Sequence, residues 1–504
     1  MKTPIFLIFA AKLQNYLDMC KFFRTFARIF CECIRMTAHS DIQNYFFLGI
    51  GGIGMSALAR YFHHRGYTVC GYDRTPSPLT KELEEEGIAI IYDDSVDTLN
   101  LKIGALSPQH TLVVRTPAVP EESVIYTYLR EQGFSILKRA EVLGIVTRQM
   151  KALCVAGTHG KTTTSTMLAH LLYQSEISTN AFLGGISVNY GTNILLDKNS
   201  NYVVVEADEY DRSFHHLTPY MSVVTAVDPD HLDIYGTPEA YREAFAHYTS
   251  LISGALVMKK GIALEPRLQA GVKLYTYGVQ NTDRSQVDLR IQTDLPDFYA
   301  DNICVKEGQI YFDYHTPTEV LPEMRLGVPV WVNVENAVAA MAMAWLNGVT
   351  AEELRRGMAS FRGVQRRFNI HVNTPHVAYI DDYAHHPEEI ATSIDSIRKL
   401  YPGRRLIGVF QPHLYTRTRD FAEGFRAVLA TLDECILLPI YPAREEPIPG
   451  VTSEMLGGQV VQKKDLIAAL KRRVAASKEP VVILTVGAGD IDRLVPEVTK
   501  ALEI

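Results

Sequence analysis

The stretch Cys154-Val-Ala-Gly-Thr-His-Gly-Lys-Thr-Thr-Thr164 decides the fold of the middle of this chain. The apolar run from Ala152 to Ala156 predicts a buried strand, and Thr162 to Leu172 predicts a helix. Gly157 and Gly160 bend the chain between them. A glycine turn between a strand and a helix presents backbone N–H groups and the positive end of a helix dipole to an anion. The stretch therefore predicts a binding site for the phosphates of a nucleoside triphosphate.

Two side chains of this stretch fit the chemistry of a bound triphosphate. Lys161 adds a positive charge for the β- and γ-phosphates, and Thr162 adds a hydroxyl for Mg²⁺. The full G-x-x-x-x-G-K-[ST] pattern is not met, because Val155 stands where its first glycine would be. A chance Gly-Lys-Thr turn is the alternative, and the flanking strand and helix argue against it. The loop residues predicted to bind ATP are Gly157, Thr158, His159, Gly160, Lys161, Thr162 and Thr163.

Length and composition place this loop in a multidomain globular protein. At 504 residues the chain is too long for one hydrophobic core, and its length suggests about three domains. The formal net charge of −7 gives no reason to expect a nucleic acid partner. The 7 cysteines form no C-x-x-C pair, so we expect reduced, mostly buried thiols in a cytoplasmic protein.

Residues 1–40 form an N-terminal extension that differs from the rest of the chain. They are rich in Phe, Leu, Ile, Lys and Arg, and no apolar run reaches the ~18 residues of a membrane span. The segment from Ile5 to Ala11 could be a short signal-type core, or the extension could be a basic helix on a membrane surface. We favour a third alternative, in which translation begins at Met36.

Residues 41–149 predict a first, Rossmann-like domain. A strand from Tyr45 is followed by a predicted helix over Met55 to Arg65, and a second strand from Tyr67 to Tyr72 ends at Asp73. This pattern is typical of a dinucleotide fold, but the same turn can hold any pyrophosphate, including that of a UDP-sugar. The turn itself is a G-x-G-x-x-G sequence at Gly49, Gly51 and Gly54.

Residues 150–365 predict the central ATP-binding domain, with a mostly parallel sheet. The strand from Tyr202 to Ala207 carries Glu206, which we expect to bind Mg²⁺ beside the glycine loop. The following acids are either further ligands or a solvated loop, namely Asp208, Glu209 and Asp211. Phe182-Leu-Gly-Gly-Ile186 is a glycine turn of the kind that approaches a ligand closely.

A third strand of this domain, from Met221 to Val227, ends at a further group of acids. In Asp228-Pro-Asp-His-Leu-Asp-Ile-Tyr235, three acids surround His231 and suggest a second divalent site. Mg²⁺ prefers oxygen ligands, so a histidine ligand needs separate support. The region from Gly261 to Pro322 shows alternating strand patterns and no recognisable chemistry.

The end of the central domain offers two further candidate groups. Asn333 and Asn336 lie on the first turns of an alanine-rich helix, and an amide can pair with the edge of adenine. Capping of the helix by Asn333 is the alternative. Arg366 and Arg367 suit a phosphate clamp, or merely a basic hinge.

Residues 366–504 predict a third, Rossmann-like domain. Strands are expected at Val377 to Asp382, Arg405 to Phe410, Cys435 to Pro439 and Val481 to Val486. The carboxyl ends of strands face the ligand crevice in open α/β sheets, so the loops there form a third wall of the site. These loops are Asp381-Asp-Tyr-Ala-His-His-Pro387, Gln411-Pro-His-Leu-Tyr-Thr-Arg417 and Gly487-Ala-Gly-Asp490.

With these motifs in view, the chain resembles the Mur ligase family from Tyr45 to Leu502, and within it the branch that adds L-alanine. The match rests on several motifs in the right order, which are Gly49 to Gly54, Gly157 to Thr163, Glu206-Ala-Asp-Glu209, Asp230-His-Leu-Asp233, Arg366-Arg-Phe368, Asp382 to Pro387 and Gln411-Pro-His413. Family members also use the shorter glycine loop seen here.

The resemblance implies an activity and a role for each site residue. ATP would phosphorylate the lactyl carboxylate of UDP-N-acetylmuramate, and L-alanine would attack the acyl phosphate. The catalytic residues would be Lys161, His231, Arg367, His385, His413 and Arg417. Asn333, Asn336, Arg367 and Asp382 would join the glycine loop in binding ATP. Thr162, Glu206 and His231 would bind Mg²⁺. The UDP-sugar would be held by Gly49, Gly51, Gly52, Ile53, Gly54 and Asp73.

The implied partners are the small molecules ATP, UDP-N-acetylmuramate and L-alanine, without nucleic acid or stable membrane insertion. We expect a monomer or weak homodimer whose three domains close on the substrates.

Two positions depart from the family pattern. Val332 precedes Asn333 where many members carry histidine, and Leu414 follows Gln-Pro-His where a basic residue is common. Leu414 leaves the recognition of alanine partly unexplained.

Three other functions remain open at this point. A recycling ligase that adds a whole tripeptide shares the glycine loop and the acidic strand, but the segment from Asp228 to Tyr235 fits the alanine-adding branch better. A NAD-dependent oxidoreductase would leave Lys161, Glu206 and His231 without a role. A non-catalytic nucleotide-binding scaffold would have no need to keep every phosphate and metal residue.

Overall fold

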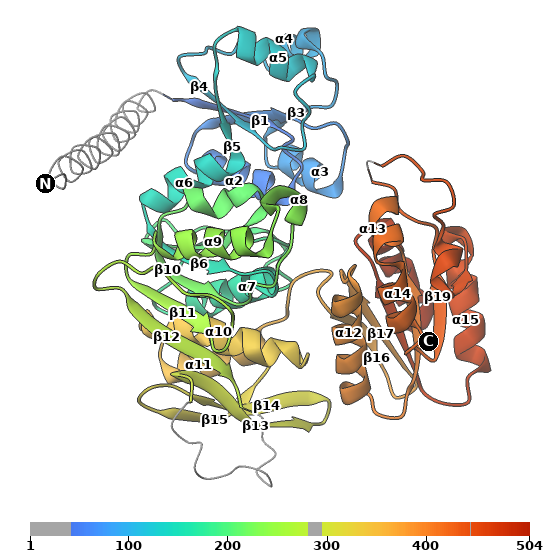
Figure 1. Cartoon of the computed structure of the whole chain (residues 1–504). Coiled ribbons are helices and arrows are strands. Elements are labelled where there is room, and N and C mark those ends of the chain that lie inside the picture. Colours follow the sequence, from blue (N-terminus) through green and yellow to red (C-terminus); the bar gives the residue numbers. More distant parts are fainter. Residues whose placement is uncertain (1–41, 281–294, 444, 504) are drawn as a thin grey trace, which may run out of the picture. The chain divides into compact units, whose positions relative to one another are not determined.

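The computed structural model describes residues 42–280, 295–443 and 445–503, and these form three sheets (Figure 1). The expected extension over residues 1–40 and the start at Met36 lie outside the described residues. The chain divides into two compact units between Arg139 and Ala140, and each is considered by itself. Three α/β sheets agree with the three expected domains, whose limits at residues 149 and 365 stay predictions.

The first unit holds a five-stranded parallel sheet in the order β3-β2-β1-β4-β5. The strand order reverses between β1 and β4, and in open α/β sheets ligands bind at such a switch point. The glycine turn follows β1, as predicted. The elements are β1 (Asn44–Leu48), α2 (Ile53–His64), β2 (Thr68–Tyr72), α3 (Pro78–Glu85), β3 (Ala89–Ile91), α4 (Val96–Lys102), β4 (Thr111–Arg115), α5 (Val124–Glu131) and β5 (Ser135–Lys138).

The second unit begins within α6 (Arg139–Arg148) and contains a ten-stranded sheet in the order β15-β14-β13-β12-β11-β10-β6-β9-β7-β8. Its elements are β6 (Lys151–Ala156), α7 (Lys161–Tyr173), β7 (Asn180–Phe182), β8 (Ile194–Leu195), β9 (Tyr202–Ala207), η1 (Tyr210–His216), β10 (Pro219–Val224), α8 (Leu232–Tyr235), α9 (Pro238–Thr249), β11 (Ala255–Lys259), β12 (Lys273–Val279), β13 (Phe298–Lys306), β14 (Gln309–His315), β15 (Val320–Arg325), α10 (Val332–Leu346) and α11 (Ala351–Ser360).

The position of β6 in this sheet explains its sequence. It pairs in parallel with β10 on one side and with β9 on the other, and every residue after Lys151 is buried. Strands of a parallel sheet covered on both faces are continuously apolar, which is why Ala152 to Ala156 shows no alternation. The predicted strand, turn and helix are therefore confirmed, and the turn lies at the carboxyl ends of three neighbouring strands.

The second unit also contains a six-stranded sheet in the order β16-β17-β21-β18-β19-β20. Only β16 is antiparallel to its neighbour, so the predicted doubly wound unit is confirmed. Its elements are β16 (Asn369–Asn373), β17 (Val377–Asp382), α12 (Pro387–Leu400), β18 (Arg405–Phe410), α13 (Tyr415–Asp420), α14 (Ala422–Leu429), β19 (Glu434–Leu437), η3 (Ser453–Leu456), β20 (Gln459–Val460), η4 (Lys463–Asp465), α15 (Leu466–Ala476), β21 (Val481–Val486), η5 (Asp490–Leu494) and α16 (Val495–Leu502).

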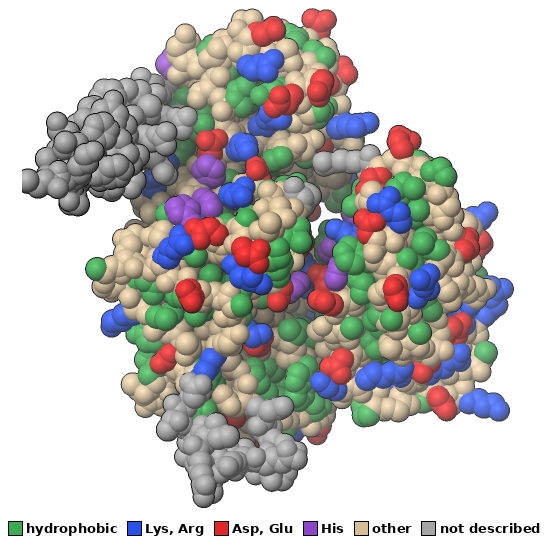
Figure 2. All heavy atoms as spheres, in the orientation of Figure 1, with side chains coloured by type: hydrophobic (Ala, Val, Ile, Leu, Met, Phe, Trp, Pro, Cys, Tyr) green, Lys and Arg blue, Asp and Glu red, His purple; other side chains and the backbone are tan. Residues whose placement is uncertain are grey.

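The expectation of reduced, mostly buried thiols holds in part, because two of the four cysteines among the described residues are buried and two are half-buried. Cys70, Cys154, Cys304 and Cys435 are free, and burial raises the pKa of the Cys70 and Cys154 thiols to about 12. Figure 2 shows Lys and Arg side chains interspersed with Asp and Glu side chains over the face in view, where the described residues form no continuous basic stripe. None of the described helices has the length and apolar character that a bilayer crossing requires.

Candidate active site

The loop between β6 and α7 has a backbone that depends on its two glycines. Gly157 has φ +134° and Gly160 has φ +78°, values that side chains rarely allow. A Cβ at Gly157 would also lie 2.1 Å from the hydroxyl oxygen of Thr225, at the end of β10. The same hydroxyl donates to the carbonyl oxygen of His159 over 2.5 Å, which fixes the loop against the sheet. Gly160 directly precedes α7, so the turn faces the positive end of this helix.

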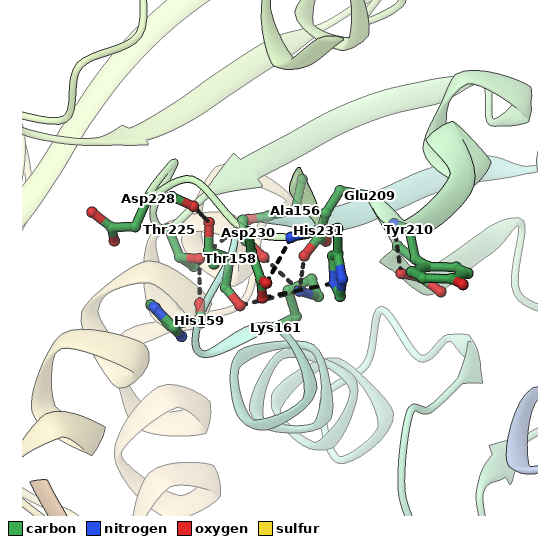
Figure 3. A network of polar contacts seen from close by, with 12 residues as sticks. Ala156, Thr158, His159, Lys161, Glu209, Tyr210, Thr225, Asp228, Asp230 and His231 are labelled. Carbon is green, nitrogen blue, oxygen red and sulfur yellow. Dashed lines mark hydrogen bonds and ion pairs between the residues drawn. The ribbon is translucent and has the colours of Figure 1, made fainter. Parts of the chain in front are cut away.

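Lys161 folds back over this loop and has three hydrogen-bond acceptors (Figure 3). Its Nζ lies 2.7 Å from the carbonyl oxygen of Gly157, 3.3 Å from that of Thr158 and 2.9 Å from Oε1 of Glu209. Burial alone would lower the pKa of Lys161, but the nearby carboxylates, Glu209 foremost, raise it. Burial raises the pKa of Glu209, and Lys161 opposes that rise. The lysine is therefore positively charged at the place where phosphates are expected.

Glu206 and Thr162 meet beside the loop with oxygen atoms suited to a divalent cation. Oε2 of Glu206 is buried and has no hydrogen-bond partner among the described residues. A Cβ on Gly184 would lie 2.0 Å from this oxygen and 3.1 Å from the Thr162 hydroxyl, so the predicted glycine turn leaves room between them. A buried, unpaired carboxylate oxygen is costly unless a cation or donor joins it. These residues fit Mg²⁺, which prefers oxygen ligands.

His231 lies at the end of the loop that follows β10, directly before α8. It precedes α8 with a φ of +52°, its Nε2 is 3.7 Å from the Asp230 carboxylate, and its ring meets Tyr210 edge-on at 5.1 Å. Among the described residues, no three His, Cys, Asp or Glu side chains converge closely enough to hold a metal by themselves. The role of His231 as a metal ligand thus stays a prediction.

A cavity of about 530 Å³ opens at the loop, and we call it the loop cavity. Its volume is in the range of small-molecule sites. The predicted residues that line it are Thr158, His159, Gly160, Lys161, Thr162, Thr163, Glu206, Asn333, Asn336, Arg367 and Asp382. The lining comes from the loop, from β9, from the start of α10 and from the segments around β17 and α12. Sequence reasoning thus brought together residues more than 200 positions apart.

Asn333 and Asn336 form a short amide chain at the start of α10. Nδ2 of Asn336 donates to Oδ1 of Asn333 over 3.1 Å, and Oδ1 of Asn336 accepts from the Thr164 hydroxyl over 3.2 Å. Asn333 is not the cap of this helix, so that alternative is wrong. The helix begins one residue earlier, at Val332, and the Asn333 amide points back to the carbonyl oxygen of Val328 at 3.5 Å. Each amide keeps further hydrogen-bonding capacity for a ligand.

Asp382 lines the loop cavity, and its carboxyl group has a raised pKa. Burial raises it to about 6, against the opposing effects of the Ser393 hydroxyl and the Arg367 guanidinium. The Ser393 hydroxyl donates to the carboxylate, and the Arg367 guanidinium lies over the Tyr383 ring at 5.0 Å. Asp382 thus changes charge slightly below neutral pH.

If Asp382 binds the ribose of ATP, as the family resemblance implies, the affinity for adenosine should fall about tenfold between pH 7 and pH 5, because ribose hydroxyls would donate to a charged carboxylate better than to a neutral one. The raised pKa of about 6 places this loss in the window around pH 6. Calorimetric titration with adenosine, whose own groups do not titrate there, measures the effect. The Asp382→Asn variant should bind weakly at both pH values, and a pH dependence that persists in this variant would exclude Asp382 as its source.

His385, His413 and Arg417 form a second group near the ends of β17 and β18. Nδ1 of His413 lies 3.4 Å from the Arg417 guanidinium, and His385 lies 3.4 Å from the carboxylate of Glu389. Burial, helped by Arg417, lowers the pKa of His413 to about 4, and burial also lowers that of His385. Both imidazoles are therefore neutral near pH 7. This group is not part of the described lining of the loop cavity.

Leu414 joins this group through its backbone rather than its side chain. Its φ is +69°, a conformation that leucine rarely adopts. Its N–H donates to the carbonyl oxygen of Tyr441 over 3.0 Å, and the Tyr441 ring stacks on His413 at 5.8 Å. The left-handed backbone at Leu414 turns the chain from His413 into α13, which begins at the next residue.

The glycine turn of the first unit is also held by its neighbours. Oδ2 of Asp73 accepts from the backbone N–H of Gly51 over 2.8 Å, so this carboxylate orders the turn itself. A Cβ on Gly54 would lie 2.6 Å from Nη1 of Arg139. Arg139 therefore places a positive charge at the start of α2, and the sequence pattern gave no signal for it. Gly49 takes a φ of +84° against Thr116, at the switch point of the sheet.

Three more lining residues escaped sequence reasoning. Lys259 and Glu335 form an ion pair of 2.9 Å at the wall of the loop cavity, and Tyr277 lies beside them. Tyr277 belongs to the region that showed no recognisable chemistry, so that expectation is corrected. It comes from β12, which joins the sheet two strands away from β10, and only the strand order reveals its position.

Three family models together match most of the chain. The Mur ligase family catalytic domain matches residues 44–151, the Mur ligase middle domain matches residues 155–344, and the Mur ligase glutamate ligase domain matches residues 366–489.

Similar curated proteins and solved structures are also ligases with such names. A UDP-N-acetylmuramate–L-alanine ligase of Parabacteroides distasonis is 56% identical over 472 residues, covering 92% of this chain and 98% of the relative. One from Phocaeicola vulgatus is 54% identical, covering 92% and 99%. The crystal structure of UDP-N-acetylmuramate–alanine ligase MurC from Thermotoga maritima is 27% identical, with a TM-score of 0.72 over 91% of this chain and 98% of that one. A murein peptide ligase from Psychrobacter arcticus, 21% identical over 92% of this chain and 99% of its own with a TM-score of 0.62, shares the fold.

Proposed function

Since the chain belongs to the Mur ligase family, we infer that it joins L-alanine to the lactyl carboxylate of UDP-N-acetylmuramate at the expense of ATP, giving ADP and phosphate. The observation that carries this function is the 56% identity, over almost the whole of both chains, to a ligase of that name. The reaction is a step of peptidoglycan synthesis, and hence of cell-wall formation. The recycling ligase is less well supported, since the murein peptide ligase structure is only 21% identical.

The loop cavity supplies what phosphoryl transfer requires. The backbone of the glycine loop and the charge of Lys161 hold the β- and γ-phosphates, while Arg367 adds a second positive charge. An oxygen of the lactyl carboxylate attacks the γ-phosphorus, and ADP leaves with the electrons of the broken P–O bond. This step needs charge neutralisation and alignment more than a protein nucleophile. Asn333, Asn336 and Asp382 are placed to hold the adenosine part of ATP.

Mg²⁺ would be held by Thr162 and Glu206, whose oxygens converge beside the loop. When bound there, the ion neutralises phosphate charge. The contribution of the protein is the buried, unpaired oxygen of Glu206, which needs a positive partner. His231 is proposed as a ligand of a second ion.

The second half of the reaction joins the amine to the acyl phosphate. The nitrogen of L-alanine attacks the acyl carbon through a tetrahedral intermediate, loses a proton, and expels phosphate with one oxygen of the original carboxylate. His385, His413 and Arg417 are proposed to hold the muramyl carboxylate or the incoming amino acid, because two neutral imidazoles and a guanidinium converge there. The UDP group is proposed to bind the turn from Gly49 to Gly54 with Asp73 and Arg139.

The proposed function is tested by phosphate release from ATP with Mg²⁺ and UDP-N-acetylmuramate, comparing L-alanine with the L-Ala-γ-D-Glu-diaminopimelate tripeptide. We expect turnover with L-alanine alone. Turnover only with the tripeptide would identify the recycling ligase. If no phosphate is released with either amine, a non-catalytic scaffold would be favoured. Binding of nicotinamide cofactor to the first unit would favour an oxidoreductase.

We also propose a cytoplasmic location and a monomer or weak homodimer. ATP and a UDP-sugar are the substrates, and reduced thiols such as those of Cys70 and Cys154 fit a reducing compartment. Sedimentation at several protein concentrations measures the assembly state, and a concentration-independent dimer would contradict it.

A further inference from the structure

Glu209 is a buried carboxylate that the proposed mechanism does not use. Its side chain is 2% exposed, and its Oε1 lies 2.9 Å from Nζ of Lys161 (Figure 3). The other acceptors of this ammonium are the carbonyl oxygens of Gly157 and Thr158, at 2.7 and 3.3 Å. A lysine ammonium has three N–H donors. Lys161 therefore has one acceptor for each of its donors.

The three acceptors of Lys161 differ in how easily they can be exchanged. Gly157 and Thr158 belong to the loop itself, so their carbonyl oxygens stay near the lysine whenever the loop keeps its shape. Glu209 comes from the end of β9 and is the only one of the three acceptors that is a side chain. A phosphate oxygen that approaches Lys161 thus displaces Glu209 more readily than either carbonyl.

The backbone of Glu209 is fixed in place. Its carbonyl oxygen accepts from the Tyr235 hydroxyl and from the backbone N–H of Arg212, the latter over 2.9 Å. Its Oε2 is buried and has no hydrogen-bond partner among the described residues. The carboxylate therefore remains close to Lys161 when the lysine turns to another partner, and its charge then lies near any phosphate bound there.

We propose that Glu209 is an internal competitor of the ATP phosphates, a carboxylate that takes the same N–H of Lys161 as a β- or γ-phosphate oxygen and so limits the affinity for triphosphates. This inference rests on the proposed binding of ATP at the loop. Glu209 is a positioning residue, because it acts on the nucleotide through Lys161. If the loop binds nucleotide phosphates less tightly because Glu209 competes for Lys161, ADP is released more readily after each turnover.

The Glu209→Gln variant tests the proposal, because glutamine keeps the size and one acceptor of the side chain but removes the charge. We expect its Kd for ATP with Mg²⁺ to fall about fivefold or more, since a charge-assisted hydrogen bond no longer has to be broken and a like charge is removed. The Kd for AMP should stay within about twofold, because the lysine reaches the β- and γ-phosphates rather than the α-phosphate. A merely structural role would not depend on the number of phosphates.

Asp211→Asn is the matched control for calorimetric titrations with ATP, ADP and AMP. It removes the same charge two residues away, from an exposed side chain, and asparagine tolerates the φ of +51° found there. An unchanged or weaker ATP affinity of Glu209→Gln, or an equal gain for AMP, would overturn the proposal. A wild-type chain that does not bind ATP would instead refute the proposed function.

A second measurement covers the case in which Glu209→Gln does not fold. In a crystal structure of the wild-type chain with Mg²⁺ and a non-hydrolysable ATP analogue, Nζ of Lys161 should lie more than about 3.5 Å from Glu209, beyond hydrogen-bonding distance. A retained 2.9 Å contact, as found here, would contradict the exchange.

Discussion

The Lys161→Ala variant should lose about 10³-fold or more in kcat for phosphate release while the chain stays folded. The charge of Lys161 is the one proposed to meet the β- and γ-phosphates, and the lysine lies in the lining of the loop cavity beside the buried Glu209. In a partly buried site such a charge is worth far more than in water, because little solvent screens it. The loss should appear mainly in kcat, since the negative charge that moves during transfer loses its nearest cation.

Two controls separate this effect from a loss of structure. Lys151→Ala removes a positive charge from the opposite end of β6, where Lys151 is exposed, and should leave kcat within about twofold. Removing Lys161 leaves Glu209 buried without its cation, which destabilises the fold by a few kcal/mol while that carboxylate stays charged. The double variant Lys161→Ala with Glu209→Gln removes both charges and should recover most of the lost thermal stability, but no activity. Phosphate release at the wild-type rate from Lys161→Ala, or from the double variant, would refute the role of Lys161.

The Glu206→Gln variant should lower kcat about 10²-fold and raise the Mg²⁺ concentration for half-maximal activity about tenfold or more. Glutamine has the same shape, but it replaces a charged oxygen pair by a neutral amide at the point where the Thr162 hydroxyl and the loop meet. Added Mg²⁺ should therefore recover part of the activity. Titration of phosphate release with Mg²⁺ at saturating ATP measures both effects.

A matched control for this charge is Glu239→Gln on the surface of α9, whose Mg²⁺ titration should overlay that of the wild type. Because Oε2 of Glu206 has no partner among the described residues, Glu206→Gln loses no protein hydrogen bond at that atom. Its thermal unfolding without Mg²⁺ should therefore stay close to that of the wild type. An unchanged Mg²⁺ titration in Glu206→Gln would remove Glu206 from the metal site.

The most completely predicted part of the site is the one encoded within a single short stretch. The loop from Gly157 to Thr163 combines strand, turn and helix in adjacent residues, so its fold and its chemistry were both visible. Glu206 could be placed because the carboxyl ends of parallel strands meet at one edge of a sheet. The order of strands along that edge was not needed for either prediction.

Contacts between distant segments were not predictable in the same way. The pairing of Lys161 with Glu209 joins residues 48 positions apart, and nothing in the sequence around β9 marks Glu209 as the partner of this lysine. Tyr277 reaches the loop cavity only because β12 follows β11 in the sheet, and Arg139 reaches α2 only because β5 lies beside β4. The mistaken cap at Asn333 had a local cause, because the helix already begins at Val332 and the Asn333 Oδ1, the atom that would cap it, accepts from the Asn336 amide instead.

The most direct test of the whole account uses UDP-N-acetylmuramate labelled with ¹⁸O in its lactyl carboxylate. If that carboxylate is phosphorylated by ATP and then attacked by L-alanine, one labelled oxygen leaves with each phosphate, and mass spectrometry of the phosphate detects it. We expect one ¹⁸O per phosphate released, together with UDP-N-acetylmuramoyl-L-alanine as the product. Unlabelled phosphate would show that water, not the lactyl carboxylate, receives the γ-phosphoryl group, and it would contradict the ligase mechanism assigned to this site.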